Sequence, residues 1–416
     1  MSILRRISAN RITTAIIASC TLATFYLIQL ATSWFGLRST GIRGPSNYMD
    51  QESILNSAKC FKTLGINVYN LDALPKGCGG FQYSIELLRF LNFTNISSIS
   101  SSVLGVSLMW ITILTLCLMF FVIKENGKVD NLIALISLSS PGIWLLLERS
   151  NYDQLVFILI VLASLLLVTK YQEFGILLIL ATVLMKFYTL PLYILTVFML
   201  RRKVSRNLFL LIAIPLTVYI LFLIRQVAAF PSTWYVSFGL KSFGLYVELV
   251  IKEKISEQFQ IHSVLSIMIG LLILGVFLQY FRRNMIKPAF VHHTKNSNRV
   301  AKSIYQSLLI VFLSCYFAGM NFDYRLILPA CLIAISPVVF ANNRYRSVMV
   351  FSGVISLWLS SFTFGLSGIP ALTLQFLGDM SLYVFISTQI LLLHAVLKPH
   401  IVARMKPITL QQTDGA

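Results

Sequence analysis

Long apolar runs separated by short polar stretches form the pattern of this chain. Most runs have about 17–25 residues, the length with which an α-helix crosses a hydrocarbon core of roughly 30 Å. These unbroken runs exclude a transmembrane β-barrel, whose strands alternate apolar and polar residues. We therefore predict twelve helical membrane segments, at 13–34, 101–123, 131–147, 153–169, 174–185, 188–200, 207–224, 262–281, 303–319, 325–341, 348–365 and 372–396.

The segments 174–185 and 188–200 are too short for two full crossings. They predict a re-entrant hairpin or two tilted, broken helices, which a membrane tolerates where protein or water covers the backbone. In both forms, the loops that follow lie on the same side of the membrane. The predicted fold class is all-α: a polytopic transmembrane helical bundle of about 11–13 helices, with residues 1–416 forming a single membrane-embedded body.

Composition agrees with this class. The chain is 57% hydrophobic and 12% charged, with a mean hydropathy of +0.79, whereas soluble proteins carry roughly 25% charged residues. The basic start "MSILRRISANR" precedes the first apolar run and predicts an uncleaved signal anchor with a cytoplasmic N-terminus. Alternating loops then place 21 Lys and Arg inside and 13 outside, as the positive-inside rule expects, and the C-terminus is cytoplasmic too. The net charge of +19 therefore reflects topology and attraction to anionic lipids, not nucleic-acid binding.

Acidic residues show the opposite distribution. Ten lie in segments predicted to be external and four in internal ones. The helix interiors carry few ionisable residues, chiefly Asp379 and His394, whereas a secondary transporter needs such groups near the midplane. This pattern favours chemistry on a lipid-linked substrate at the extracytoplasmic surface.

Two predicted external loops, 35–100 and 225–261, are too long to be simple connectors. The first contains "MDQESILNSAKCFKTLGI" and "IELLRFLNF", whose apolar residues recur at helical spacing and predict two interfacial helices. It also contains Cys60 and Cys78, which an oxidising compartment would permit to bridge. The second loop is aromatic and ends in "KEKISEQ"; it is compatible with an interface helix or with a flap over a site.

Four polar sites stand at the predicted outer ends of helices. They are "NYMDQES", "ERSNYD", "MKFYTLP" and "NFDYRLILP". Each alone is compatible with a helix cap or a snorkelling cation. Together they bring acids, cations and tyrosines to one membrane face, which is typical of a site for phosphate and hydroxyl groups.

In order and spacing, "ERSNYD" before a helix, "LMKFYTLPLYIL" followed by "RRK", and "NFDYRLILP" before another helix resemble the polyprenyl-phosphate-sugar-dependent glycosyltransferases of the GT-C superfamily. The similarity is to the bacterial mannosyltransferase-like branch. It covers about residues 10–340 and includes "GINVYN" and "CGGFQYS" in the first loop. Relatives often have glycine where Ser150 stands, which leaves the backbone role of this position open.

The resemblance implies a GT-C-like bundle in the bacterial inner membrane and an inverting glycosyltransferase with an extracytoplasmic active site. A polyprenyl-phosphate-linked sugar would be the donor, and a hydroxyl of a glycolipid or glycan the acceptor. The resemblance implies Asp50 as the general base, with Glu52 as the alternate. It also implies a substrate-binding set of Glu148, Arg149, Asn151, Asp153, Lys186, Tyr188, Asp323, Tyr324 and Arg325, in which Arg149, Lys186 and Arg325 would neutralise the departing phosphate.

No cofactor is predicted, and the scattered histidines supply no metal site; a divalent cation has no support in the sequence. The alternatives are a lipid-linked oligosaccharide flippase or transporter and an O-antigen-type polymerase. A flippase would need charged residues deep in several helices, and a polymerase a large external loop late in the chain. The sugar, acceptor and linkage are not determined by the sequence.

Overall fold

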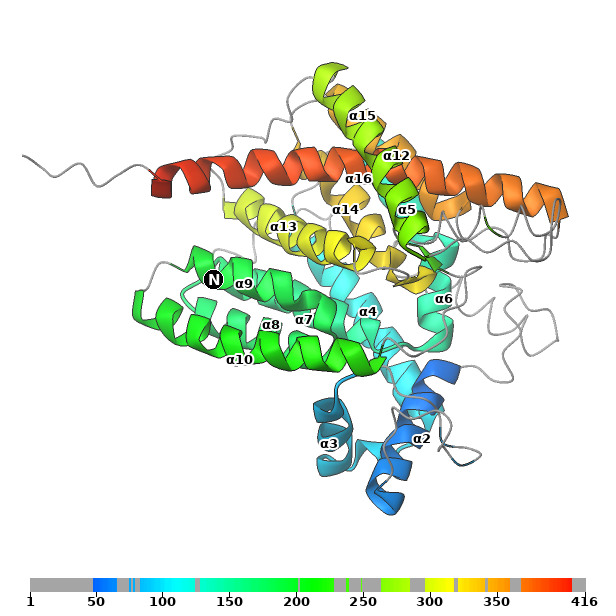
Figure 1. The fold of residues 1–416 in the computed structure, drawn as a ribbon, viewed down its shortest axis with the longest axis vertical. Coiled ribbons are helices and arrows are strands. Elements are labelled where there is room, and N and C mark those ends of the chain that lie inside the picture. The colour runs from blue at the N-terminus through cyan, green and yellow to red at the C-terminus, as the bar shows by residue number, and fades with distance from the viewer. Residues whose placement is uncertain are drawn as a thin grey trace, which may run out of the picture.

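The computed structural model describes residues 48–65, 75, 78, 83–123, 128–200, 203–227, 237–238, 248, 263–284, 296–317, 321–340, 343–359 and 368–405. This part of the chain is almost entirely helical (Figure 1), which confirms the predicted helical class. Its α-helices are α2 (Met49–Leu64), α3 (Ile85–Phe93), α4 (Ser101–Val122), α5 (Lys128–Leu138), α6 (Pro141–Arg149), α7 (Asp153–Leu167), α8 (Gln172–Met185), α9 (Leu190–Met199), α10 (Lys203–Val227), α12 (Ser263–Asn284), α13 (Asn296–Phe317), α14 (Ile327–Val339), α15 (Asn343–Leu359) and α16 (Gly368–Met405).

Three 3₁₀ turns and a pair of short strands connect these helices. The turns are η3 (Ile96–Ser98), η4 (Phe187–Thr189) and η6 (Asp323–Leu326). The strands β1 (Ser237–Phe238) and β2 (Asn321–Phe322) pair antiparallel, with Ser237 opposite Phe322. The predicted first span, 13–34, and most of the loop 225–261 lie outside the described residues.

Five helices in the described ranges are long and apolar enough to cross a membrane: Ser101–Val122, Val204–Phe222, Leu265–Asn284, Arg299–Phe317 and Thr373–Ala395. This supports a polytopic membrane protein, although it is fewer than the twelve crossings predicted. Four predicted crossings form α7, α8, α9 and α14, which have 15, 14, 10 and 13 residues. At a rise of 1.5 Å per residue they are about 15–22 Å long, shorter than the hydrocarbon core.

The predicted segment 131–147 is divided into two helices. Within it, α5 and α6 differ in direction by 48°. Pro141 opens α6, and Ser140 before it has an extended backbone with φ −67° and ψ 150°. A proline disfavours helical geometry in the preceding residue and cannot donate to the previous turn, so the helix breaks there. Counted as one bent span, α5 and α6 would be a sixth crossing of the described part.

The predicted short pair 174–185 and 188–200 forms a helical hairpin. Helix α8 ends at Lys186, which is extended with φ −141° and ψ 113°, and its backbone N–H donates to Thr182 O over 2.8 Å. The η4 turn follows and leads into α9, which has Pro191 in its first turn. In Figure 1, α7 to α10 run side by side in the green part of the molecule. The hairpin thus brings Lys186 to the same end of this layer as the start of α7.

Helix α14 lies at the centre of the bundle, because all its residues are buried. It packs between α13 and α15. By contrast, the apolar windows of α10 and α12 are only 22% buried, against 67% for α13. The exposed side chains of α10 and α12 are mostly Leu, Ile, Val and Phe, as expected of helices that face lipid.

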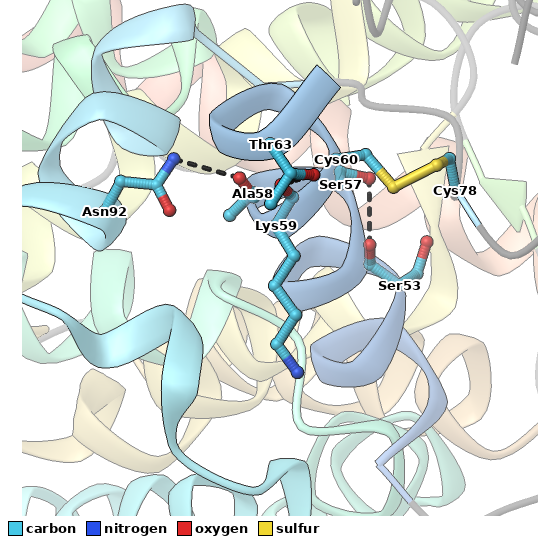
Figure 2. Close-up of a disulfide and its surroundings, with 8 residues drawn as sticks. All are labelled: Ser53, Ser57, Ala58, Lys59, Cys60, Thr63, Cys78 and Asn92. Carbon is cyan, nitrogen blue, oxygen red and sulfur yellow. Dashed lines mark hydrogen bonds between the residues drawn. A yellow bond between two sulfur atoms is a disulfide. The ribbon is translucent and has the colours of Figure 1, made fainter. Parts of the chain in front are cut away.

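Helices α2 and α3 form a separate unit at the edge of the bundle (Figure 1). Both predicted helices of the first loop are therefore confirmed as helices. Cys60 of α2 forms a disulfide with Cys78, and Asn92 Nδ2 of α3 donates to Ala58 O of α2 over 2.9 Å (Figure 2). A small apolar cluster packs α2 against α3 and reaches the bundle at Tyr152; it contains Ile54, Ala58, Tyr83, Leu87, Leu88, Leu91 and Tyr152.

Candidate functional site

The first contact of the site joins the start of α2 to the end of α6. Tyr48 precedes α2 in the left-handed region, with φ 64°, and its backbone N–H donates to Glu148 O over 2.9 Å. The ring of Tyr48 lies so close to Gly105 of α4 that a Cβ added there would be 2.4 Å from Tyr48 Cδ1. Gly105 therefore leaves room for the ring of Tyr48. Tyr48 precedes the first residue of α2 and stands two positions before Asp50.

The Asp50 cluster consists of Asp50, Arg149 and Asn151. Arg149 donates from Nε to Asp50 Oδ1 over 2.8 Å, and its Nη2 lies 2.6 Å from the same oxygen. Asn151 Nδ2 donates to the other carboxylate oxygen, Oδ2, over 2.7 Å. These charge-assisted bonds fix the orientation of a carboxylate whose side chain is still 15% exposed.

The Asp153 cluster is more deeply buried. Asp153 Oδ2 accepts from Arg325 Nε over 3.1 Å, while Oδ1 lies 3.5 Å from Lys186 Nζ and accepts from the Tyr188 hydroxyl. The side chains of Asp153 and Lys186 are 3% and 6% exposed. The Asp153 carboxylate thus contacts two cations, Lys186 and Arg325, in a site with little access to water.

Asn151 links the two clusters. Its Oδ1 accepts from the backbone N–H of Asp153 over 3.0 Å and from the Tyr83 hydroxyl over 3.3 Å, while its Nδ2 holds Asp50. The preceding Ser150 ends α6 in the left-handed region with φ 50°. Glycine adopts this conformation at lower cost than serine, and the left-handed turn lets α6 end directly before Asn151.

Two aromatic rings cover the cations of the Asp153 cluster. Lys186 Nζ lies 3.7 Å from the centroid of the Tyr83 ring, and Arg325 Cζ lies 4.8 Å from that of Tyr188. Both distances are within the range of cation–π attraction. The tyrosines therefore stabilise positive charge without adding negative charge.

Burial changes the acid–base properties of two residues in the connections between helices. It lowers the pKa of Lys186 to about 8, although the neighbouring Asp153 carboxylate opposes this shift. Burial also raises the pKa of Tyr152, whose hydroxyl accepts from Gln51 Nε2 over 3.3 Å. The ammonium of Lys186 can therefore lose its proton at mildly alkaline pH.

The structure brings together Asp50, Arg149, Asn151, Asp153, Lys186, Tyr188 and Arg325. Other residues of the predicted set are placed differently. Glu52 is exposed on α2, whereas Glu148 is partly buried and contacts Tyr48 through its backbone oxygen. Asp323 and Tyr324 belong to η6, which packs against α6, but their side chains lie outside the described part.

Sequence reasoning assigned no role to Tyr83 or Gln51. Tyr83 belongs to "CGGFQYS", which was part of the family resemblance, but the resemblance gave this tyrosine no role. Gln51 is adjacent to Asp50, but nothing in the sequence pairs it with Tyr152. Within the described ranges, no three His, Cys, Asp or Glu side chains are grouped as metal ligands.

Comparisons of the chain with models of protein families, with curated proteins and with solved structures found no match.

Proposed function

We propose that this chain is an inverting glycosyltransferase of the bacterial inner membrane, which moves a sugar from a polyprenyl phosphate to an acceptor hydroxyl at the extracytoplasmic face. One observation carries the proposal: Asn151 joins the Asp50 cluster to the Asp153 cluster in a continuous polar network. Such a network combines a carboxylate that can take a proton with cations that can stabilise a departing phosphate.

Asp50 acts as the general base in this proposal. Arg149 donates a hydrogen bond from Nε and forms an ion pair through Nη2, both at Oδ1, and Asn151 donates one bond to Oδ2. Since a carboxylate has about four lone-pair positions, Oδ2 retains one for an acceptor hydroxyl. General base catalysis of this kind contributes about 10²–10⁴-fold to the rate. Glu52, exposed and two positions further along α2, is the alternate base.

The bond changes are those of a direct displacement. The acceptor oxygen forms a bond to the anomeric carbon of the sugar, and its proton passes to Asp50. The bond from the anomeric carbon to the phosphate oxygen breaks, and its electron pair leaves with the polyprenyl phosphate. Attack opposite the leaving group inverts the anomeric centre. Lys186, Arg325 and Arg149 stabilise the charge that develops on the phosphate.

The remaining polar residues hold the sugar or orient the cations. In this proposal Asn151, Tyr188 and Tyr324 bind sugar hydroxyls, while Glu148, Asp153 and Asp323 hold the cations in place. The acceptor is a glycolipid or glycan, the membrane lipids surround the bundle, and no cofactor takes part.

The test is a transfer assay on the full chain in nanodiscs. Polyprenyl-phosphate mannose serves as the first donor probe, followed by other hexose and pentose donors, with extracted bacterial glycolipid as acceptor. Mass spectrometry detects released polyprenyl phosphate and the lengthened glycolipid. The variant Asp50→Asn is expected to lose at least about 10²-fold in rate. Glu52→Gln tests the alternate base and is expected to keep most of the activity; the opposite result would assign the base to Glu52.

Three results would contradict this function. Full activity of Asp50→Asn would remove Asp50 as the base. Translocation of an intact lipid-linked sugar across proteoliposomes without transfer would support a flippase. Repeated addition of whole oligosaccharide units would support a polymerase.

A further inference from the structure

Tyr83 lies between the α2–α3 unit and the polar network. It is 7% exposed and stands two positions before the start of α3. Its ring covers Lys186 Nζ at 3.7 Å, its hydroxyl donates to Asn151 Oδ1 over 3.3 Å, and its ring packs edge-on against Tyr152 at 6.2 Å. No role was assigned to Tyr83 in the proposed reaction, although it contacts both ends of the network.

The chain around Tyr83 is held in place from several directions. Cys78, five positions earlier, is bonded to Cys60 of α2. Ser84 Oγ donates to Leu184 O, two positions before Lys186, and the Tyr219 hydroxyl of α10 donates to Glu86 of α3. Tyr83 is therefore anchored to the same helix end that carries Lys186. A ring fixed in this way is pre-organised over the ammonium.

Lys186 needs such support because the effects of its other neighbours on its positive charge partly cancel one another. Burial removes it from water, and Arg325 repels it. Asp153 attracts it, but this carboxylate is shared with Arg325 and Tyr188. The titratable or charged groups that face Lys186 from the packed elements are Asp50 of α2, Tyr83 before α3, Asp153 of α7, Tyr188 of η4, Cys315 of α13 and Arg325 of η6.

We propose that Tyr83 is a positioning residue whose ring keeps Lys186 charged and directed into the network. The hydroxyl of Tyr83 also donates to Asn151, but the ring is held in place by its contact with Tyr152 and by the anchored chain on either side. The use of Lys186 for a phosphate rests on the proposed function. The Tyr83–Lys186 relationship itself can be measured without any assay of transfer.

The experiment is competitive labelling of lysines with trace acetic anhydride across pH, read by mass spectrometry on the full chain in nanodiscs. The midpoint of Lys186 labelling reports its protonation. Tyr83→Leu keeps apolar cover but removes the π face, so this midpoint is expected to fall by about one pH unit. Tyr83→Phe keeps the face and is expected to retain the wild-type midpoint. Lys59 and Lys62, which are exposed on α2, serve as internal references. Their labelling midpoints are expected to be the same in every variant.

A second pair of variants preserves the shape of the ring. Phenylalanine and trifluorophenylalanine at position 83 differ little in size, but fluorine weakens the negative face of the ring. The trifluorinated variant is expected to lower the Lys186 midpoint relative to phenylalanine. This pair tests the proposal even if Tyr83→Leu does not fold.

An unchanged or raised Lys186 midpoint in Tyr83→Leu would overturn the proposal, as would equal midpoints in the phenylalanine and trifluorophenylalanine variants. Equal shifts in Tyr83→Phe and Tyr83→Leu would overturn the role of the ring. If the expected shifts occur but the wild-type chain transfers no sugar, the proposed function fails while the positioning role of Tyr83 stands. With active protein, Tyr83→Leu should raise the donor KM at pH 8 more than it lowers kcat.

Discussion

Arg325 donates from Nε to Oδ2 of Asp153 over 3.1 Å and so joins the η6 turn to the first residue of α7, 172 positions earlier. The contact is partly buried, and Lys186 approaches the same carboxylate from the α8–η4 connection. Asp153 thus contacts both cations. The stability of this end of the bundle depends on it more than on either cation.

Replacing Asp153 should therefore destabilise the protein more than replacing Lys186. Asp153→Asn removes the carboxylate that contacts both Lys186 and Arg325, a loss of about 3–5 kcal/mol by analogy with other buried ion pairs. Lys186→Met leaves Asp153 paired with Arg325 and removes a desolvated charge, so its loss should be smaller. Thermal unfolding in detergent, followed by intrinsic fluorescence, measures both. The double variant Asp153→Asn/Lys186→Met should be more stable than Asp153→Asn alone. Equal Tm values for Asp153→Asn and wild type would contradict the stabilising role of Asp153.

The pKa of Lys186, lowered by burial to about 8, predicts opposite pH effects on binding and stability. Above pH 8 the ammonium loses its proton, so kcat/KM for the donor should fall. Between about pH 8 and 10.5 the unfolded chain binds more protons at this residue than the folded one, so its contribution to stability should rise with pH. The transfer assay, recorded from pH 7 to 10, tests the expected fall in kcat/KM. The Tm over the same range tests the expected rise in stability.

A matched variant separates Lys186 from other groups that titrate in this range. Lys186→Arg stays charged, so its kcat/KM should not fall near pH 8. The same alkaline fall in Lys186→Arg and wild type would assign the effect to another residue.

The Cys60–Cys78 disulfide should stabilise the α2–α3 unit, which carries Asp50 and Tyr83. The bridge closes a loop of 18 residues, and the chain-entropy model gives about 3 kcal/mol for a loop of similar length. The variant Cys60→Ser/Cys78→Ser should unfold at lower temperature and show faster hydrogen exchange in α2 and α3. Cys117→Ala, which removes a thiol from α4, should leave the exchange of these two helices unchanged. Slow exchange of α2 and α3 in the double variant would show that packing alone holds the unit.

Two helical glycines provide a test of the α2–α4 contact. A Cβ at Gly105 would lie 2.4–2.8 Å from three atoms of the Tyr48 ring, whereas one at Gly275 would meet no atom within 4 Å. Gly105→Ala should displace Tyr48 and, with it, Asp50, and should lower both Tm and transfer. Gly275→Ala, the control, should leave both nearly unchanged. If the two alanine variants behave alike, the close contact of Tyr48 with α4 does not set the position of Asp50.

Much of the helical structure was predictable because its cause is local. The apolar run 101–123 became Ser101–Val122, and the amphipathic patterns of the first loop became α2 and α3. The break at Pro141 has a local cause as well, but hydropathy alone could not distinguish a kinked span from a straight one. The lengths of the short helices α7, α8, α9 and α14 were not predicted by hydropathy, and only α14 is buried along its whole length.

The sequence also predicted which polar residues stand at helix ends, but not how they pair. Asp50 could have contacted any of three cations, and only the packing of α2 against α6 pairs it with Arg149. Tyr83 and Gln51 join the site for the same reason. Their contacts depend on the positions of α3, α6 and α7, which no local pattern encodes.

The sequence by itself therefore determined a helical membrane protein with charged groups gathered at helix ends, because backbone hydrogen bonding in an apolar medium and hydrophobic burial depend on nearby residues. The tertiary structure decided that Asp50 pairs with Arg149, that Asp153 holds Lys186 and Arg325, and that Asn151 connects them. Apart from the bond between Asn151 and Asp153, these contacts join positions about 30 to 170 apart. Such contacts form only when packing fixes the distance and orientation of whole helices.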